Sequence, residues 1–271
     1  MMSLSRQQVK QIARLKQKKY RIQEGKLLIE GARFVIEALQ SNWHLDMVIH
    51  THNFREHGLA KQIDALARQK SVACFAANTA DFNKITDTSS TQGVIAIVQQ
   101  KSYSASAVDE LIMQRRFLLL AVEALTDPGN LGTLIRTAAW FGIDAIVTGP
   151  DCVAWHNPKS LRSSMGAIFH LPVHEVADFQ RFLSRSHAEG AQICCADQQG
   201  DQQYDRTEYN PRRILLIGNE TDGVSAASLQ RADLCVTIPR FGSGESLNAA
   251  VAAAIIMAEF SKPRKKAPVY E

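Results

Sequence analysis

The chain has 271 residues, of which 45% are hydrophobic and 21% are charged, and its formal net charge is +4 at pH 7. This composition supports a sizeable globular core, and no apolar run approaches the ~20 residues that a membrane-spanning helix needs. Five cysteines without a C-x-x-C pair argue against both a disulfide framework and a zinc site. The N-terminus lacks the apolar core of a signal peptide, so we expect a cytoplasmic protein.

The first 100 residues alternate short apolar strands with helical periods, which favours an α/β sheet with crossover connections. The first predicted element is a basic helix over residues 5–24. The elements expected after it are strands at 26–30, 47–50, 72–75 and 93–98, and helices at 32–41, 56–70 and 79–85.

A polar, Ser-rich stretch over residues 99–106 is the best linker in the sequence. A second α/β series follows it. Its predicted strands are 117–122, 145–147, 192–194, 214–217 and 234–238, and its helices are 131–141, 159–166, 176–188, 225–231 and 246–260. We therefore expect an N-terminal domain over 1–100, a linker over 101–114 and a second domain over 115–271.

Positive charge gathers at both ends of the chain. Residues 1–26 hold eight Lys or Arg against a single acid, Glu24, and the tail adds Lys262, Arg264, Lys265 and Lys266. Basic ends of this kind commonly meet phosphate backbones. The alternative is a solvated helix face and a solvated tail.

The first polar segment is 127–136. Asp-Pro-Gly-Asn is a strong turn signal, and Asn130 is a suitable N-cap for the helix that follows. Arg136 would lie about two turns into that helix. Its permanently charged guanidinium could hold a phosphate or a developing alkoxide, or it could simply pair on the surface.

Two further loops each join a predicted strand to a predicted helix, at residues 218–225 and 238–248. Gly218 would allow a ligand close to the backbone, and the second loop ends in Ser-Leu-Asn before a helix of small residues. Ligands of α/β sheets bind outside the carboxyl ends of the strands, so three such loops predict a pocket for a small polar ligand. The loop at 238–248 lacks the third glycine of a dinucleotide fingerprint, and the sequence has no Walker A loop.

A fourth segment, residues 157–167, places Lys159 and Arg162 at a predicted helix start. Such a position suits phosphate contacts. A solvated helix end is the alternative reading.

Together these segments resemble the SpoU (TrmH-like) ribose methyltransferases of the SPOUT superfamily. Residues 130–136 look like the family's first motif, residues 218–223 like its second, and residues 238–248 like its third. Their order and spacing over residues 117–260 also agree, and residues 162–169 resemble the segment that these proteins carry there. The N-terminal part, with Glu30-Gly31 before a helix and Gln92-Gly93-Val94 before the linker, resembles the family's ribosomal-protein-like RNA-binding domain.

The resemblance implies methyl transfer from S-adenosylmethionine to a ribose 2′-hydroxyl of RNA, most simply ribosomal RNA. It also implies a mostly parallel sheet with a C-terminal trefoil knot, and a homodimer through the knot region, with no metal and no membrane. Three alternatives stay open: a transfer RNA ribose methyltransferase, a non-catalytic RNA-binding or ribosome-assembly factor, and a nucleotide-dependent oxidoreductase on a doubly wound sheet. The missing fingerprint disfavours the oxidoreductase.

The resemblance assigns roles to residues of this sequence. The implied catalytic residues are Arg136, Asn130, Glu220, Ser246 and Asn248. The implied cofactor-binding residues are Leu216, Gly218, Asn219, Ile238, Pro239, Ser246 and Leu247. The RNA-binding candidates are Lys18, Lys19, Arg21, Arg33, Lys159, Arg162 and Arg240.

Two positions depart from the family pattern. Thr221-Asp222 replaces the small residue usual after Asn-Glu, and Arg240 stands where many relatives have an apolar residue. Arg240 adds positive charge near the expected pocket. Neither change removes an implied catalytic group, so we expect an active enzyme.

Overall fold

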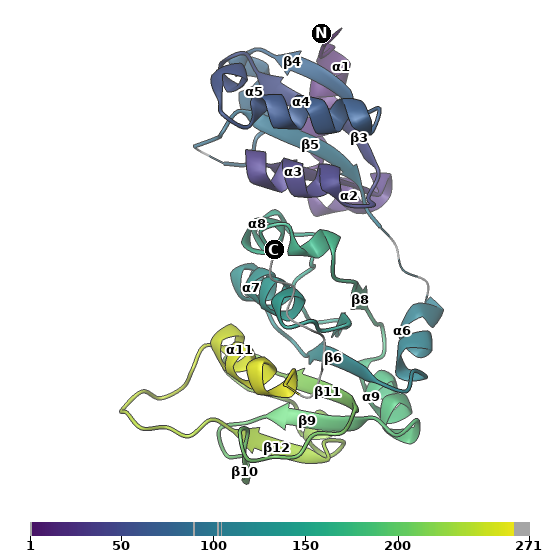
Figure 1. The fold of residues 1–271 in the computed structure, drawn as a ribbon, viewed down its shortest axis with the longest axis vertical. Helices are drawn as coiled ribbons and strands as arrows, with labels where there is room; N and C mark the ends of the chain where they lie inside the picture. The colour runs from purple at the N-terminus through teal and green to yellow at the C-terminus, as the bar shows by residue number, and fades with distance from the viewer. Residues whose placement is uncertain (1, 89, 102, 104, 263–271) are drawn as a thin grey trace. The chain divides into compact units, whose positions relative to one another are not determined.

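The computed structural model describes residues 2–88, 90–101, 103 and 105–262 (Figure 1). Most of the predicted basic tail, including Arg264, Lys265 and Lys266, lies outside these residues. The chain divides into two compact units. The first comprises Met1–Ser102 with His156–His170, and the second comprises Tyr103–Trp155 with Leu171–Glu271. A segment from the middle of the second predicted domain thus belongs to the first unit.

The first unit is built on a five-stranded sheet. Its strand order is β1 (Met2–Ser3), β4 (Ala73–Ala77), β3 (Leu45–Thr51), β5 (Val94–Gln99) and β2 (Lys26–Glu30). β1, β4 and β3 are parallel, whereas β5 runs antiparallel to both of its neighbours. The helices before residue 102 are α1 (Arg6–Arg14), α2 (Lys18–Glu24), α3 (Ala32–Gln40), η1 (Asn53–Glu56), α4 (Ala60–Gln69) and α5 (Thr79–Ile85).

The single basic helix predicted over residues 5–24 is wrong, because the chain breaks between α1 and α2. A capping box of Ser5 and Gln8 starts α1. The buried Arg21 then donates hydrogen bonds to the carbonyls of Leu15 (3.1 Å) and Lys16 (2.7 Å). These bonds satisfy carbonyl groups that a continuous helix would use itself, so they stabilise the break.

The segment 156–170 carries α8 (Pro158–Ser163) and η2 (Ala167–Phe169). The ring of Phe169 packs against Phe34 of α3, with centroids 5.4 Å apart, and edge-on against Trp43, at 5.2 Å. Edge-to-face and tilted aromatic contacts of this kind add to the stability gained from burial. They explain why this segment belongs to the first unit.

The second unit holds a seven-stranded sheet in which every neighbouring pair is parallel. Its order is β10 (Gln202–Gln203), β12 (Leu234–Thr237), β9 (Gln192–Ala196), β11 (Arg212–Ile217), β6 (Phe117–Val122), β7 (Ala145–Thr148) and β8 (Val173–Glu175). Its helices are α6 (Ala105–Ile112), α7 (Pro128–Trp140), α9 (Phe179–Ala188), α10 (Ala226–Leu229) and α11 (Ala249–Phe260). All residues of β6 and β7 are buried, as expected for strands covered on both faces.

Several elements of this unit differ from the prediction. Helix α6 occupies much of the stretch predicted as a linker. The strands β8 and β10 were not predicted, because they are short and contain too few apolar residues to form a pattern. The trefoil knot stays a prediction.

Helices α7 and α11 pack side by side and run in the same direction. Near their starts, Asn248 contacts Asn130, and near their ends the Ser261 hydroxyl donates to the Phe141 carbonyl at 2.9 Å. Helix α11 also lies against β9 and β11 (Figure 1). This packing brings the starts of both helices to the same edge of the sheet. Within the described residues, none of the helices has the length and apolar character to cross a membrane.

Candidate active site

Three loops leave the same edge of the parallel sheet. They follow the carboxyl ends of β6, β11 and β12, at Val122, Ile217 and Thr237. Strands β6 and β11 are direct neighbours whose last residues pair, and β9 separates β11 from β12. This is the edge at which α/β sheets bind their ligands.

One continuous set of side-chain hydrogen bonds joins the three loops. The Asn248 amide donates to the side-chain oxygen of Asn130 at 3.0 Å, and the Asn130 amide donates to Glu220 Oε1 at 2.6 Å. Asn248 also caps α11, since its Oδ1 accepts from the backbone amides of Ala250 and Val251. Three of the five implied catalytic residues therefore lie in direct contact.

The expected N-cap role of Asn130 is wrong. Asp127 caps α7 instead, because its Oδ1 accepts from the Asn130 backbone amide at 2.8 Å and Pro128 occupies the first helical turn. Proline suits that turn because it has no amide hydrogen to satisfy. The Asn130 side chain is thereby free to face the other two loops.

The loop after β11 is stabilised from within. Asn219 and Gly223 exchange two backbone hydrogen bonds, and the Asn219 amide donates to the Ala124 carbonyl at 2.8 Å. A Cβ on Gly218 would lie 2.1 Å from the Gly223 carbonyl. The sequence predicts that Gly218 lets a ligand approach the backbone, but the chain's own turn already requires a glycine there.

Glu123 is a site residue that the sequence analysis missed. Directly after β6, its carboxylate accepts hydrogen bonds from the Ser225 amide (3.0 Å), the Ser225 hydroxyl (2.8 Å) and the Ser228 hydroxyl (2.8 Å). Gln180 of α9 donates to it as well, at 3.3 Å. Glu123 thus fixes the start of α10 against the end of β6. An acidic residue directly after an apolar strand was the available signal.

The loop over residues 240–248 is exposed throughout. Arg240 folds back and donates to the Gly244 carbonyl at 3.0 Å, while Phe241 is 97% exposed. Ser246 and Leu247 are exposed as well, and over the residues that the structure describes no hydrogen bond joins either of them to Asn130 or Glu220.

The structure does not bring Arg136 to the hydrogen-bonded side chains. Arg136 is exposed on α7, one turn before Trp140, which is 86% exposed. In the part of the chain that the structure describes, Arg136 forms no hydrogen bond or ion pair. Its charge is therefore available to a substrate or to another protein chain.

The implied cofactor-binding residues carry a donor set that suits S-adenosylmethionine. Over the described residues, the main-chain polar groups of Gly218, Ile238 and Leu247 have no hydrogen-bond partner in the protein. Peptide N–H and C=O groups can pair with the edge of an adenine ring. Leu216 is buried in β11, one residue before the strand ends at Ile217, and Pro239 follows Ile238. The residues present therefore fit the cofactor.

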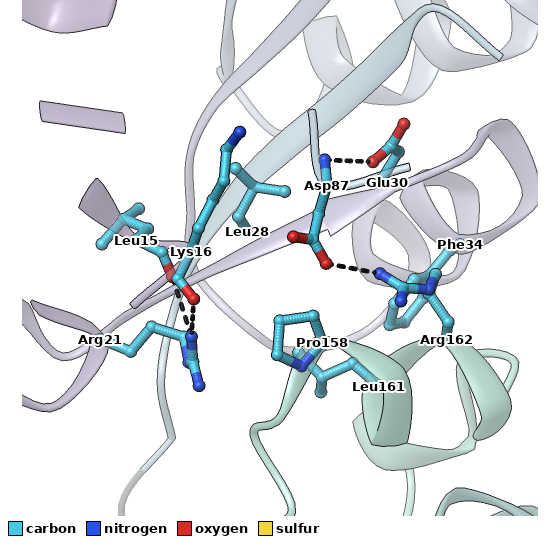
Figure 2. Close-up of a pocket in the computed structure, with 10 residues that line it drawn as sticks. All are labelled: Leu15, Lys16, Arg21, Leu28, Glu30, Phe34, Asp87, Pro158, Leu161 and Arg162. Carbon is cyan, nitrogen blue, oxygen red and sulfur yellow. Dashed lines mark hydrogen bonds and ion pairs between the residues drawn. The ribbon is translucent and has the colours of Figure 1, made fainter. Parts of the chain in front are cut away.

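Two of the RNA-binding candidates have partners inside the first unit (Figure 2). Arg21 is only 4% exposed, and besides its two carbonyl contacts it donates from Nε to His156 Nδ1 at 3.3 Å. This burial contradicts the prediction that Arg21 contacts RNA. Arg162 forms an ion pair of 3.0 Å with Asp87, so its charge is already compensated.

The cavity that these side chains line holds only about 10 Å³ and suits at most one water molecule. Lys18, Lys19, Arg33 and Arg240 are exposed and remain candidates for RNA contact, as does Lys159.

Neither metal nor cysteine chemistry is indicated. Among the described residues, no group of three or more His, Cys, Asp or Glu side chains could hold a metal ion. All five cysteines are free thiols, and Cys194 and Cys195 are buried. Burial raises the pKa of Cys194 to about 12, so this thiol is not a nucleophile at neutral pH.

The fold and the site define an α/β enzyme whose ligand site is built from three loops at the carboxyl edge of a parallel sheet. Two family models match the chain: SpoU rRNA Methylase family over residues 117–258, and MRM3-like substrate binding domain over residues 6–96. The chain belongs to the SpoU rRNA methylase family.

Similar proteins cover almost the whole chain. The 23S rRNA (guanosine(2553)-2'-O)-methyltransferase RlmP of Bacillus subtilis is 32% identical over 94% of this chain and 96% of its own length. The 23S rRNA (uridine(2479)-2'-O)-methyltransferase of Streptomyces viridochromogenes is 28% identical over 90% of this chain and 85% of its own. The crystal structure of an AdoMet-bound rRNA methyltransferase from Sinorhizobium meliloti superposes with a TM-score of 0.83, at 26% identity over 97% of each chain.

These matches confirm four expectations from the sequence: the family, the α/β fold with a mostly parallel sheet, RNA 2′-O-methyltransferase activity, and S-adenosylmethionine as the cofactor. They also confirm RNA as the substrate class. The oxidoreductase alternative is thereby excluded.

Proposed function

We propose that this protein methylates the 2′-hydroxyl of one ribose in large-subunit ribosomal RNA, with S-adenosylmethionine as the methyl donor. The hydrogen-bonded side chains of Asn248, Asn130 and Glu220 carry this proposal, because they join the three family motifs at one edge of the sheet. The RlmP protein of Bacillus subtilis, which spans nearly the same length, is named for a 23S rRNA target.

The chemical problem is the weak nucleophilicity of a ribose hydroxyl. Bound S-adenosylmethionine supplies a methyl group activated by its positively charged sulfur. The protein must align the hydroxyl oxygen with that methyl group and favour the loss of the hydroxyl proton. We assign the alignment to the loops that Asn130, Glu220 and Asn248 hold together.

To Arg136 we assign the handling of negative charge at the reaction site. A guanidinium stays protonated at any working pH, so it cannot remove the hydroxyl proton itself. It can hold the neighbouring phosphate, or stabilise the negative charge that develops on the ribose oxygen. Arg136 is exposed and has no partner among the described residues, which leaves it available for RNA. Ser246, exposed on the third loop, is assigned to substrate positioning.

We further propose that the protein is a homodimer through α7 and α11. Helix α11 has a single charged residue, Glu259, and is apolar on all sides. A helix of this kind is normally buried, yet Val251 near the start of α11 is exposed, as is Trp140 at the end of the adjacent helix α7. A second copy of the chain would cover this face.

Sedimentation velocity tests the dimer. Trp140→Glu places a charge on this face and should shift the protein from dimer to monomer at micromolar concentration, whereas Met113→Glu, at an exposed residue just after α6, should not. A monomeric unmodified protein would refute the dimer and leave the methyl transfer proposal intact.

We propose that residues 1–100 select the RNA and that the second unit, which begins at Tyr103, carries the methyl transfer. The match of residues 6–96 to a substrate-binding domain supports the first assignment. We propose a cytoplasmic location, because the similar proteins named for 23S rRNA come from bacteria, whose ribosomal RNA lies in the cytoplasm.

The reaction is tested with purified protein, S-adenosylmethionine labelled in the methyl group, and total RNA from cells that lack this gene. Label in a 2′-O-methylnucleoside of the large ribosomal RNA supports the proposal. Label in transfer RNA would support the alternative substrate. Cofactor binding without transfer to free RNA or to ribosomal particles would instead support a non-catalytic assembly factor.

A further inference from the structure

Outside the methyl transfer site, the first unit carries an open groove of about 790 Å³ between α1 and α5. It is lined by Arg6, Val9, Lys10, Ala13, Arg14, Gln17, Asp81 and Lys84. Four of these eight side chains are cations and one is a carboxylate. The groove therefore presents a strongly positive surface.

Helix packing explains how α1 presents these charges. Val9 and Ile12 are buried in the core with Phe82 and Ile85 of α5, so the two helices hold each other in place. Arg6, Lys10 and Arg14 are exposed and follow one another at four-residue spacing. Residues so spaced lie on one helix face about 6 Å apart along the axis. The three cations thus form a stripe along the groove.

The single carboxylate, Asp81, interacts electrostatically with Arg6 but leaves Lys10 and Arg14 of this stripe uncompensated. Asp81 is already bound by Lys84, with an Nζ–Oδ1 distance of 2.7 Å. Lys10 has no ion pair in the part of the chain that the structure describes, and Arg14 lies over the Tyr20 ring at 5.3 Å instead of beside an acid. The first turn of α1 also contains no acidic residue, although acids are favoured there.

We propose that the groove between α1 and α5 binds the phosphodiester backbone of the substrate RNA, with Lys10 and Arg14 as its main phosphate contacts. A row of uncompensated cations matches a row of phosphates, and an open groove lets a strand pass through. Ala13, which also lines the groove, has a small side chain and leaves room beside the stripe. This inference rests on the proposed function, and it locates part of the RNA path on the first unit.

Salt dependence of RNA binding tests the inference. Lys10→Gln/Arg14→Gln is compared with Lys61→Gln/Arg68→Gln, which removes the same charge from exposed positions on α4. Both variants and the unmodified protein are titrated against protein-free 23S rRNA transcript by filter binding over a series of salt concentrations. Each phosphate contact to single-stranded RNA contributes about 0.7 to the slope of log K against log salt.

We expect the slope of the groove variant to be smaller by about 1.4, with an affinity loss of roughly tenfold at moderate salt. The α4 variant should bind like the unmodified protein. All three proteins should bind S-adenosylmethionine equally in calorimetry, which shows that they are folded. An unchanged slope in the groove variant, or an equal loss in the α4 variant, overturns the inference.

Chemical protection of lysine side chains by bound RNA tests the same inference on the unmodified protein. RNA should protect Lys10 from acetylation by an amine-reactive ester more than it protects Lys61, and equal reactivity with and without RNA overturns the inference. A negative result for RNA binding at the groove can be told apart from a negative result for the proposed function. If only the groove proposal is wrong, the unmodified protein still methylates ribosomal RNA. If the proposed function is wrong, it does not.

Discussion

Asn248 and Asn130 are 118 residues apart in the sequence, yet the side-chain amide of the first donates a 3.0 Å hydrogen bond to the side-chain oxygen of the second. The side-chain amide of Asn130 in turn donates a 2.6 Å hydrogen bond to Oε1 of Glu220, which lies 90 residues further along the chain. Asn130 lies in the first turn of α7, Glu220 in the loop after β11 and Asn248 at the start of α11, so the three side chains come from separate segments at the carboxyl edge of the sheet. A change at Asn130 should therefore disturb all three loops at once.

Asn130→Asp keeps the size of the side chain but replaces a donor with a second carboxylate facing Glu220. We expect kcat/KM for methyl transfer to fall about 10- to 100-fold, because the loops lose their common hydrogen bond and gain a repulsion. Thr133→Ala, at an exposed residue on the same helix, is the control. If both variants retain activity within twofold, the hydrogen bonds among these loops do not matter for the reaction.

Gly218→Ala should destabilise the second unit by about 3 kcal/mol or more, since the new Cβ would overlap the Gly223 carbonyl. The control is Gly242→Ala, where a Cβ meets nothing within 4 Å. Urea unfolding measures both. Equal unfolding midpoints for the two variants would refute the tight turn that we describe.

Glu123→Gln tests the carboxylate that fixes the start of α10. The glutamine would place an N–H group where Glu123 has an oxygen that accepts from Ser225 or Ser228. We therefore expect the free energy of unfolding to fall by roughly 1–3 kcal/mol. We also expect weaker cofactor binding. Glu175→Gln removes the charge of an exposed residue at the end of β8, which β7 separates from β6, and should change neither quantity. A Glu123→Gln protein that binds S-adenosylmethionine normally would argue against this positioning role.

His156 should make the first unit sensitive to acid. Burial, with help from Arg21 and Lys18, lowers the pKa of His156 from 6.5 to about 4. Between these two pH values the unfolded chain binds the proton and the folded chain does not, so the free energy of unfolding falls as the pH is lowered through this range. The full loss is at most roughly 3 kcal/mol.

His156→Asn keeps a side-chain acceptor for Arg21 but cannot titrate. Its stability should fall less than that of the unmodified protein between pH 6.5 and pH 4, as measured by thermal unfolding. Parallel pH profiles for the two proteins would show that His156 does not contribute.

The sequence allowed the placement of the three loops, because each follows a short apolar strand and carries Gly with Asn. The apolar runs of β6 and β11 were long enough to identify as buried strands. The same reasoning missed β10, Gln202–Gln203, which pairs with β12 but has no apolar residue. A strand that depends on its neighbour for pairing leaves no signal of its own.

Long-range packing was the other limit. The break between α1 and α2 depends on where the Arg21 side chain goes, and that side chain follows from burial against His156, 135 residues away. The assignment of residues 156–170 to the first unit depends on Phe169 fitting between Phe34 and Trp43. Neither contact is contained in local spacing or composition.

The most direct test of the central claim is the chemical position of the transferred methyl group. Ribosomal RNA labelled by the purified protein is digested to nucleosides, and the unmodified protein is compared with Arg136→Ala. We predict label in a single 2′-O-methylnucleoside, and a loss of about 100-fold or more in the variant with unchanged S-adenosylmethionine binding. Label on a base instead of a ribose, or equal rates for the two proteins, would contradict the account.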